Sequence, residues 1–272
     1  MRISEQKTIS PLFLLPTLFL LALYTTMQVH IYPNYEALSS AAADEIVDML
    51  KTKPDAVLCF AAGETPRGTY SLLPAKAKEK DVDFSRCTFI GLDEWVGIPP
   101  QNEGSCHFFL QKYLFEPLRI SSSQVHLFDG MAENIDQQCQ VMDDTISKKG
   151  SIDLMLVGVG MNGHIGFNEP GVPFDKYSHV IDLDETTQLV GQKYFAKATR
   201  LKQGITLGLK HLMHASKVTL LANGVKKAEV ISKAIDGEVD VYLPASIIQL
   251  HKNAKVMIDE EAASLCRPRE TV

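Results

Sequence analysis

The sequence predicts an α/β fold, with a Rossmann-like, mostly parallel sheet and helices on both faces, built as a single domain. From Met27 onward, short apolar runs of strand character alternate with longer segments of helical spacing. The chain has 272 residues, 45% of them hydrophobic and 22% charged, which suits one large α/β domain. Glycine-rich and acidic clusters directly follow several predicted strands, where parallel sheets bind ligands.

In the first half of the domain, the sequence predicts four strands separated by helices. The first strand shows polar–apolar alternation, and the later ones are continuous apolar runs of the kind buried in parallel sheets. The second helix is placed near Pro66, because the first turn of a helix tolerates proline. The expected strands are residues 29–32, 56–60, 87–92 and 124–128, and the expected helices are residues 35–50, 66–80, 106–114 and 135–148.

The second half continues this alternation around one irregular segment. Residues 166–177 hold two prolines and two glycines, so we expect a loop there, and a long loop beside a site is often a lid. A helix is expected to follow it. The remaining elements are strands at residues 153–157, 217–222 and 255–258 and helices at residues 182–195 and 226–235.

The N-terminal segment differs from the rest of the chain. Residues 11–24 are an almost unbroken apolar run, shorter than the roughly 20 residues of a membrane span. The run resembles the apolar part of a signal peptide, but no convincing small-residue cleavage site follows. Two interpretations stay open: residues 1–26 are an apolar leader, or the start is mis-assigned and the natural chain begins at Met27. In both, residues 27–272 form the functional domain.

Charge and cysteine content exclude several classes of protein. The formal net charge is −6, so the chain lacks the basic character of a nucleic-acid-binding protein. Its five cysteines include no CxxC pair and no zinc-ligand spacing, so we expect reduced thiols in a cytoplasmic protein. We expect no metal, no nucleic-acid partner and no membrane association of the domain.

An anion site is predicted after the strand at residues 56–60. Gly63 and Thr65 lie where a glycine turn leads into a helix, whose N–H groups and the Thr65 hydroxyl would bind an anion. Glu64 opposes an anion there unless its side chain faces away. The alternative is a plain strand-to-helix turn.

Two adjacent carboxylates, Asp93 and Glu94, follow the strand at residues 87–92. One of them can enter a crevice and act as a base while the other turns outward. Partial burial and the neighbouring like charge would raise the pKa of the base toward neutrality. The alternative is a solvated acidic turn.

A glycine-rich loop follows the strand at residues 153–157. Residues 158–163 match GxGxxG, but a dinucleotide fingerprint must open a helix, and further glycines and prolines follow here. We therefore expect no nucleotide cofactor. The loop instead brings His164 and Glu169 into one crevice, where the carboxylate fixes the imidazole tautomer for proton transfer. A simply packed histidine is the alternative.

Two lysines on later elements would add positive charge to a phosphate site. Lys193 lies on the helix expected after the loop, and Lys227 follows the strand at residues 217–222. The alternative is that both are solvated helix lysines.

Together these motifs resemble the glucosamine-6-phosphate deaminase (isomerase) family over about residues 29–265. The strings that carry the resemblance are LDEWVG at 92–97, GVGMNGHIGFNEPG at 158–171 and PASIIQLH at 244–251. Trp95 and residues 204–210 are similar to the galactosamine-6-phosphate branch. The 6-phosphogluconolactonase group is a more distant relative with the same fold.

The resemblance implies conversion of an amino-sugar 6-phosphate, glucosamine or galactosamine, to a ketose 6-phosphate and ammonia, without a cofactor. Asp93 matches the enolisation base, His164 the ring-opening residue and Glu169 its carboxylate partner. Asn162 stands where some members carry a third acid. The positions that match phosphate-binding residues are Gly63, Thr65, Lys193 and Lys227.

The sequence also departs from the family pattern. Lys193 stands where well-studied members have arginine, and residues 62–66 read AGETP where members usually read TGGTP. Residues 172–181 lack the basic effector-binding residues of the allosteric branch, so we expect no activation by N-acetylglucosamine 6-phosphate. The family includes monomers and hexamers, so a homo-oligomer stays open. A lactonase-like hydrolase and a non-catalytic sugar-phosphate sensor are the alternatives in function, against which Asp93 and His164 argue.

Overall fold

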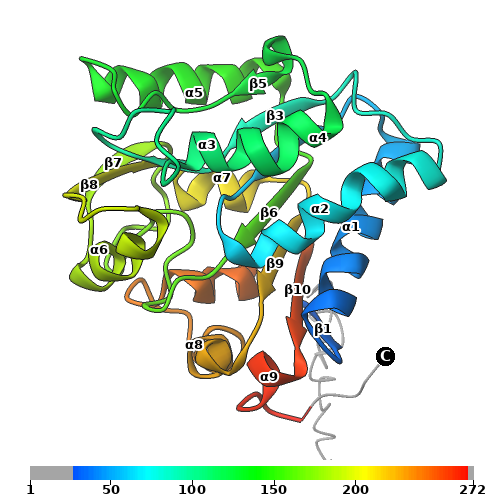
Figure 1. The fold of residues 1–272 in the computed structure, drawn as a ribbon. Coiled ribbons are helices and arrows are strands. Elements are labelled where there is room, and N and C mark those ends of the chain that lie inside the picture. Colours follow the sequence, from blue (N-terminus) through cyan, green and yellow to red (C-terminus); the bar gives the residue numbers. More distant parts are fainter. Residues whose placement is uncertain (1–26, 269–272) are drawn as a thin grey trace, which may run out of the picture.

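A seven-stranded sheet forms the centre of the computed structural model, which describes residues 27–268. Its strands are all parallel, in the order β1-β10-β9-β6-β2-β3-β5 (Figure 1). The strands are β1 (Gln28–Tyr32), β2 (Val57–Phe60), β3 (Thr88–Gly91), β5 (Val125–His126), β6 (Leu154–Gly158), β9 (Val218–Ala222) and β10 (Ala254–Asp259). The predicted parallel sheet is thus confirmed.

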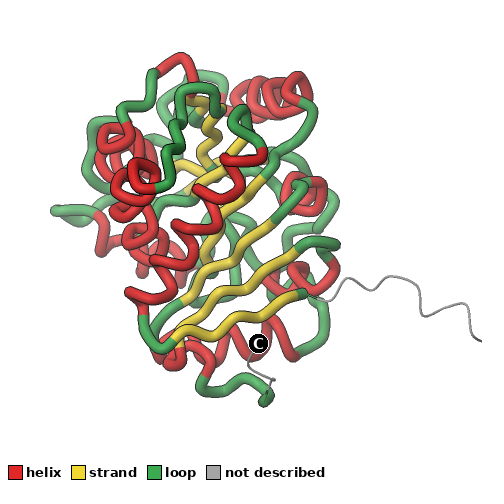
Figure 2. Tube along the Cα trace, turned by 90° about the vertical axis from the view of Figure 1, so that its right-hand side faces the viewer, coloured by secondary structure: helices red, strands yellow, loops and turns green. Residues whose placement is uncertain are grey.

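Helices cover both faces of this sheet, as predicted, so that the strands form a middle layer (Figure 2). In β2, Leu58 and Phe60 pack with the helices of one face, whereas Val57 and Cys59 pack with those of the other. The first face carries α1 (Tyr35–Thr52), α2 (Glu64–Glu79) and α3 (Cys106–Leu110), and the second carries α5 (Ile135–Lys149), α7 (Leu209–His214) and α8 (Ala228–Asp236).

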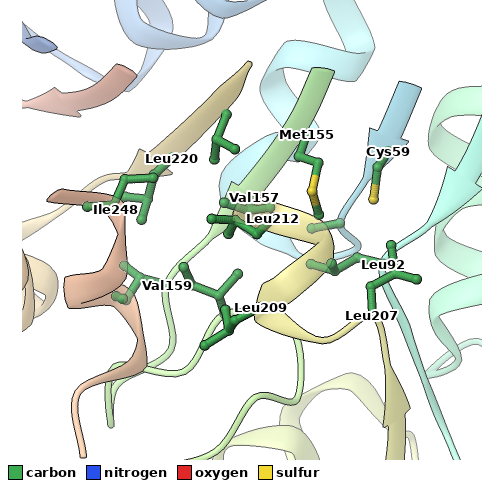
Figure 3. Close-up of a cluster of buried hydrophobic side chains, with 14 of the residues drawn as sticks. Cys59, Leu92, Met155, Val157, Val159, Leu207, Leu209, Leu212, Leu220 and Ile248 are labelled. Carbon is green, nitrogen blue, oxygen red and sulfur yellow. The ribbon is translucent and has the colours of Figure 1, made fainter. Parts of the chain in front are cut away.

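The hydrophobic core of the second face lies under the ends of the strands that carry the site loops. Figure 3 shows Met155 and Val157 of β6 with Leu220 of β9 among the side chains of α7. Leu220 is fully buried, and burying a side chain of this size contributes about 1.5–3 kcal/mol. This packing helps to hold β6 and β9 in place.

A second, three-stranded sheet was not predicted. It is antiparallel, in the order β4-β8-β7, formed by β4 (Asp93–Trp95), β8 (Gln203–Thr206) and β7 (His179–Asp182). The alternative of a solvated acidic turn at residues 93–94 and the expectation of a helix from residue 182 were therefore wrong. The β4–β8 pairing joins segments more than 100 residues apart, so no local pattern reveals it.

The remaining helices also differ in detail from the prediction. The expected helix at residues 106–114 is α3 continued by a π-helical turn, and α6 begins three residues later than predicted, after the N-cap Asp184. These further elements are a π-helical turn at Gln111–Phe115, α4 (Glu116–Leu118), α6 (Glu185–Gly191), α9 (Glu260–Ala263) and 3₁₀ turns at Ser122–Gln124, Gln192–Tyr194, Val225–Lys227 and Pro244–Leu250.

The apolar segment at residues 1–26 lies outside the described residues. Within residues 27–268, no helix combines the length and the apolar character that a membrane crossing needs.

Candidate active site

A hollow opens beyond the carboxyl ends of β2, β3 and β6, the edge at which parallel sheets bind ligands. Five of the predicted site residues line it: Gly63, Thr65, Asp93, Asn162 and His164. The other three lie around it and do not line it. The structure therefore brings the catalytic and phosphate-binding candidates to one place.

Asp93 is the first residue of β4 and faces the hollow, while Glu94 points to the opposite side of the strand. Glu94 is only 3% exposed and accepts hydrogen bonds from the backbone N–H groups of Trp95 (2.8 Å), Cys106 (3.0 Å) and His107 (2.8 Å). The expected outward orientation of the second carboxylate is thus wrong. The side of β4 opposite the hollow is covered by the start of α3, whose free N–H groups bind this carboxylate.

The surroundings of Asp93 favour its protonated form. Burial raises the pKa of Asp93 to about 7, the charge of Glu94 adds to this, and a hydrogen bond from the Cys106 thiol acts in the opposite direction. Burial also raises the pKa of Glu94 to about 7, but its three amide donors favour the ionised form. When the pair holds one proton, we place it on Asp93. A carboxylate with a pKa near 7 is suited to take up a proton at neutral pH.

The loop that carries His164 starts where β6 ends, and it opens no helix, as predicted. Gly160 donates its N–H to the carbonyl of His164 at 2.9 Å, which closes a tight turn. A Cβ on Gly160 would lie 2.3 Å from Nε2 of the His164 ring. Gly163 has a φ of +85° and would meet Leu243 at 2.3 Å. These two glycines therefore make room for the ring and the turn.

His164 and Glu169 are brought together as predicted. Nδ1 of His164 lies 3.3 Å from Oε2 of Glu169, and Nδ2 of Asn162 donates to the same oxygen at 2.8 Å. Glu169 is 4% exposed. Burial raises its pKa, but hydrogen bonds from His164, Thr187 and Asn162 outweigh this, so the net pKa is lowered. An ionised Glu169 can therefore orient the imidazole.

The loop is fastened to the second sheet at its far end. Asn168, which is 1% exposed, donates from Nδ2 to the carbonyls of Ile165 and Leu207, both at 2.8 Å. The N–H of Phe167 donates to Oγ1 of Thr206 in β8 at 3.2 Å. Asn168 thus has a structural role, and it holds the neighbouring Glu169 in place.

Sequence reasoning missed Thr187, which α6 brings to within 3.0 Å of Nδ1 of His164. Asp184, the N-cap of α6, lies 3.3 Å from Nδ2 of Asn162. The one signal in the sequence was the spacing of Asp184 and Thr187, because residues three apart share one face of a helix. The placement of α6 against the loop could not be predicted from this spacing.

The predicted anion site at the start of α2 has the expected backbone arrangement, a glycine turn that leads into a helix. Gly63 adopts a φ of +125° and precedes the helix, and Thr65 donates its hydroxyl to Oδ1 of Asn223 at 2.8 Å. The carboxylate of Glu64 turns to Arg67, with Oε2 and Nη1 3.1 Å apart. Both side chains are largely exposed, so Glu64 leaves the helix N-terminus free for an anion.

Of the two lysines, Lys227 lies closer to the site. Its Nζ donates to the carbonyl of Val159, a lining residue, at 2.6 Å. Burial lowers the pKa of Lys227 to about 8, and the charge of Lys193 adds to this. Lys193 is exposed and holds its Nζ 4.8 Å from the ring centre of Tyr194, which lines the hollow. Both charges therefore lie next to residues that line the hollow.

Comparison with known proteins agrees with this geometry. The sequence profile of the family described as glucosamine-6-phosphate isomerases/6-phosphogluconolactonase matches residues 33–258. Glucosamine-6-phosphate deaminase of Thermoanaerobacter pseudethanolicus is 39% identical over 240 residues, which cover 88% of this chain and 95% of the relative. The enzyme of the same name from Shouchella clausii is 40% identical over 233 residues, which cover 85% and 94%.

Solved structures show the same fold. A monomeric glucosamine-6-phosphate deaminase superposes with a TM-score of 0.85 at 35% identity, covering 88% of this chain and 100% of that one. The 6-phosphogluconolactonase of Trypanosoma brucei superposes with a TM-score of 0.66 at 20% identity, covering 88% and 98%. At this lower identity the likeness concerns the fold alone.

Proposed function

The chain belongs to the family of glucosamine-6-phosphate isomerases and 6-phosphogluconolactonases, and on this premise we propose that it is a glucosamine-6-phosphate deaminase. It would convert the amino-sugar phosphate to a ketose 6-phosphate and ammonia. One observation carries the proposal: Asp93, whose pKa is about 7, and His164 line the same hollow beside the free N-terminus of α2. A base, an acid–base imidazole and an anion site are the groups this reaction needs.

The phosphate of the substrate would bind at the start of α2. Its N–H groups supply donors, the Thr65 hydroxyl would turn from Asn223 to the phosphate, and the helix dipole favours a negative charge there. Lys227 and Lys193 would add positive charge from the other side. This anchoring would place the sugar between Asp93 and His164.

The chemistry would begin with ring opening. His164 would take the proton of the C1 hydroxyl and return a proton to the ring oxygen, which gives the open-chain aldehyde. Asp93 would then remove the proton on C2, and the electron pair would form the C1–C2 double bond while the C1 oxygen takes a proton from the ammonium group, which gives an enolamine. Each positioned acid or base typically contributes about 10²–10⁴-fold to the rate.

Deamination would follow from the return of the proton. Asp93 would deliver it to C1, which leaves an imine at C2. Water would add to C2, and its two protons would pass to the nitrogen, which leaves as ammonium to give the ketose 6-phosphate. The cycle returns each group to its starting protonation state, so the enzyme is unchanged.

The direct test is ammonia release from glucosamine 6-phosphate and galactosamine 6-phosphate, measured side by side on the full chain. Release from glucosamine 6-phosphate is the expected result, with formation of the matching ketose 6-phosphate. Hydrolysis of 6-phosphogluconolactone without ammonia release would assign the chain to the other branch of the family. Release from neither sugar by folded protein would overturn the proposal.

The galactosamine substrate is the second candidate, because Trp95 borders the hollow in an aromatic cluster. Its ring centre lies 4.5 Å from that of Phe167 and 6.0 Å from that of Phe195. Sequence similarity of Trp95 to the galactosamine branch supports this candidate. The ratio of the two kcat/KM values would decide between the sugars.

We also propose a reducing, cytoplasmic setting for the enzyme. Four cysteines, Cys59, Cys87, Cys106 and Cys139, are buried and form no disulfide. Stable disulfides are rare in reducing compartments, so buried thiols fit such a setting. Localisation of the tagged full chain outside the cytoplasm would contradict this.

A further inference from the structure

The environment of His164 contains a hydroxyl to which the proposed reaction assigns no role. Thr187, in the first turn of α6, is 4% exposed and holds Oγ1 3.0 Å from Nδ1 of His164. Oε2 of Glu169 is farther from the same nitrogen, at 3.3 Å. The hydroxyl is thus the nearer partner of Nδ1.

The chemistry of the three groups fixes the direction of these hydrogen bonds. An ionised carboxylate only accepts, so the proton of a neutral imidazole must lie on Nδ1 for His164 to bond to Glu169. A hydroxyl donates one proton and accepts others. The Thr187 hydroxyl can therefore accept from Nδ1–H and turn its own proton toward Glu169, a donation that would lower the pKa of that carboxylate.

The other ring nitrogen is left free by this arrangement. Nε2 of His164 forms no hydrogen bond with any residue in the described part of the chain, and it lies over Gly160, which lines the hollow. With the proton held on Nδ1, Nε2 presents a lone pair. That is the form a base needs to take a proton from the sugar C1 hydroxyl.

We propose that Thr187 is a positioning residue: its hydroxyl bridges Nδ1–H of His164 and the carboxylate of Glu169, and thereby keeps Nε2 as the unprotonated nitrogen facing the hollow. The role depends on α6, because Asp184 caps this helix by accepting the N–H of Thr186 at 2.9 Å. The catalytic consequence rests on the proposed function, whereas the tautomer of His164 does not.

The first measurement is the tautomer of His164, read from the two-bond ¹H–¹⁵N spectrum of the full chain labelled with ¹⁵N-histidine. The spectrum is recorded at a pH at which the ring is neutral, and a His164→Gln sample assigns the signals. We expect Nδ1 to be protonated in the wild type. A wild type protonated on Nε2 would overturn the proposal without any variant.

The second measurement compares variants of Thr187. Thr187→Val removes the hydroxyl at nearly constant volume, and Thr187→Ser retains it. A hydrogen bond of this kind is worth a factor of about five to ten, so Thr187→Val should lower kcat by about that factor with little change in KM. Its His164 signals should move toward the Nε2-protonated form. Thr187→Ser should keep the wild-type tautomer and most of the turnover.

A matched control is Thr145→Val on α5, which loses a hydroxyl bonded to the carbonyl of Val141 and lies outside the site. Wild-type turnover combined with an unchanged His164 tautomer in Thr187→Val would overturn the proposal. If Thr187→Val fails to fold, the proposal is tested by the wild-type spectrum and by the tautomer and turnover of Thr187→Ser. A wild type that releases no ammonia would overturn the proposed function. The tautomer of His164 would still test whether Thr187 bridges His164 and Glu169.

Discussion

Replacing Asp93 by asparagine keeps the size of the side chain and removes its ability to ionise. The variant therefore tests two consequences of the burial of Asp93 beside Glu94. The first is catalytic. Without the base the proton on C2 stays in place, and kcat should fall on the order of 10³-fold. KM should change much less, because the introduced asparagine would still fill the same space.

The second consequence is a gain in stability at alkaline pH. Burial and the charge of Glu94 raise the pKa of Asp93 from 3.8 to about 7, which disfavours its ionised form in the folded protein by up to about 4 kcal/mol. The folded state binds this proton more tightly than the unfolded state. Proton binding by Asp93 therefore contributes fully to the stability of the folded protein below about pH 4, and this contribution is lost as the pH rises through about 7.

Asparagine carries no proton to lose, so the variant should become more stable than the wild type as the pH rises. The free energy of unfolding, measured by urea denaturation at about pH 5 and pH 8, should favour Asp93→Asn more strongly at pH 8. Asp144→Asn, at an exposed position on α5, is the control and should show no such pH-dependent difference. Near-normal turnover of Asp93→Asn would remove Asp93 from the mechanism. A variant that gains nothing at pH 8 relative to pH 5 would refute the electrostatic reasoning.

Three further results are expected. Because burial lowers the pKa of Lys227 to about 8, kcat/KM should decline above that pH as the lysine loses its charge, and Lys227→Met should raise KM at least about tenfold and flatten this alkaline limb. Gly160→Ala would place Cβ 2.3 Å from Nε2 of His164 and displace the ring, so kcat should fall on the order of 10²-fold while the circular dichroism spectrum is retained. Leu220→Ala, in the core between β6 and β10, should lower the free energy of unfolding by about 2–5 kcal/mol in urea denaturation, and kcat of the folded variant should remain near that of the wild type.

The parts of the fold that local patterns encode were predictable. The central strands of the large sheet are short apolar runs buried on both sides, and each long helix repeats its apolar residues at helical spacing. For this reason β6 and α5 were predicted to within about a residue. The small antiparallel sheet was missed because Asp93 pairs with Thr206, and that register depends on the folded chain.

The site shows the same division between local and long-range information. His164 and Glu169 lie five residues apart in one glycine-rich loop, so their proximity was visible in the sequence. Thr187 reaches His164 only because α6 packs on that loop, and Glu94 is turned inward only because α3 begins beside β4. Groups supplied by a neighbouring element leave no signal in the spacing of the residues they serve.

The small sheet is connected to both groups that are proposed to transfer protons, Asp93 and His164. Asp93 and His179 flank Thr206 in adjacent strands, so one row of paired residues runs from Asp93 to the start of β7. The side chain of Thr206 also accepts the N–H of Phe167, in the loop of His164. A displacement of this sheet would carry both groups in the same direction and preserve the gap between them.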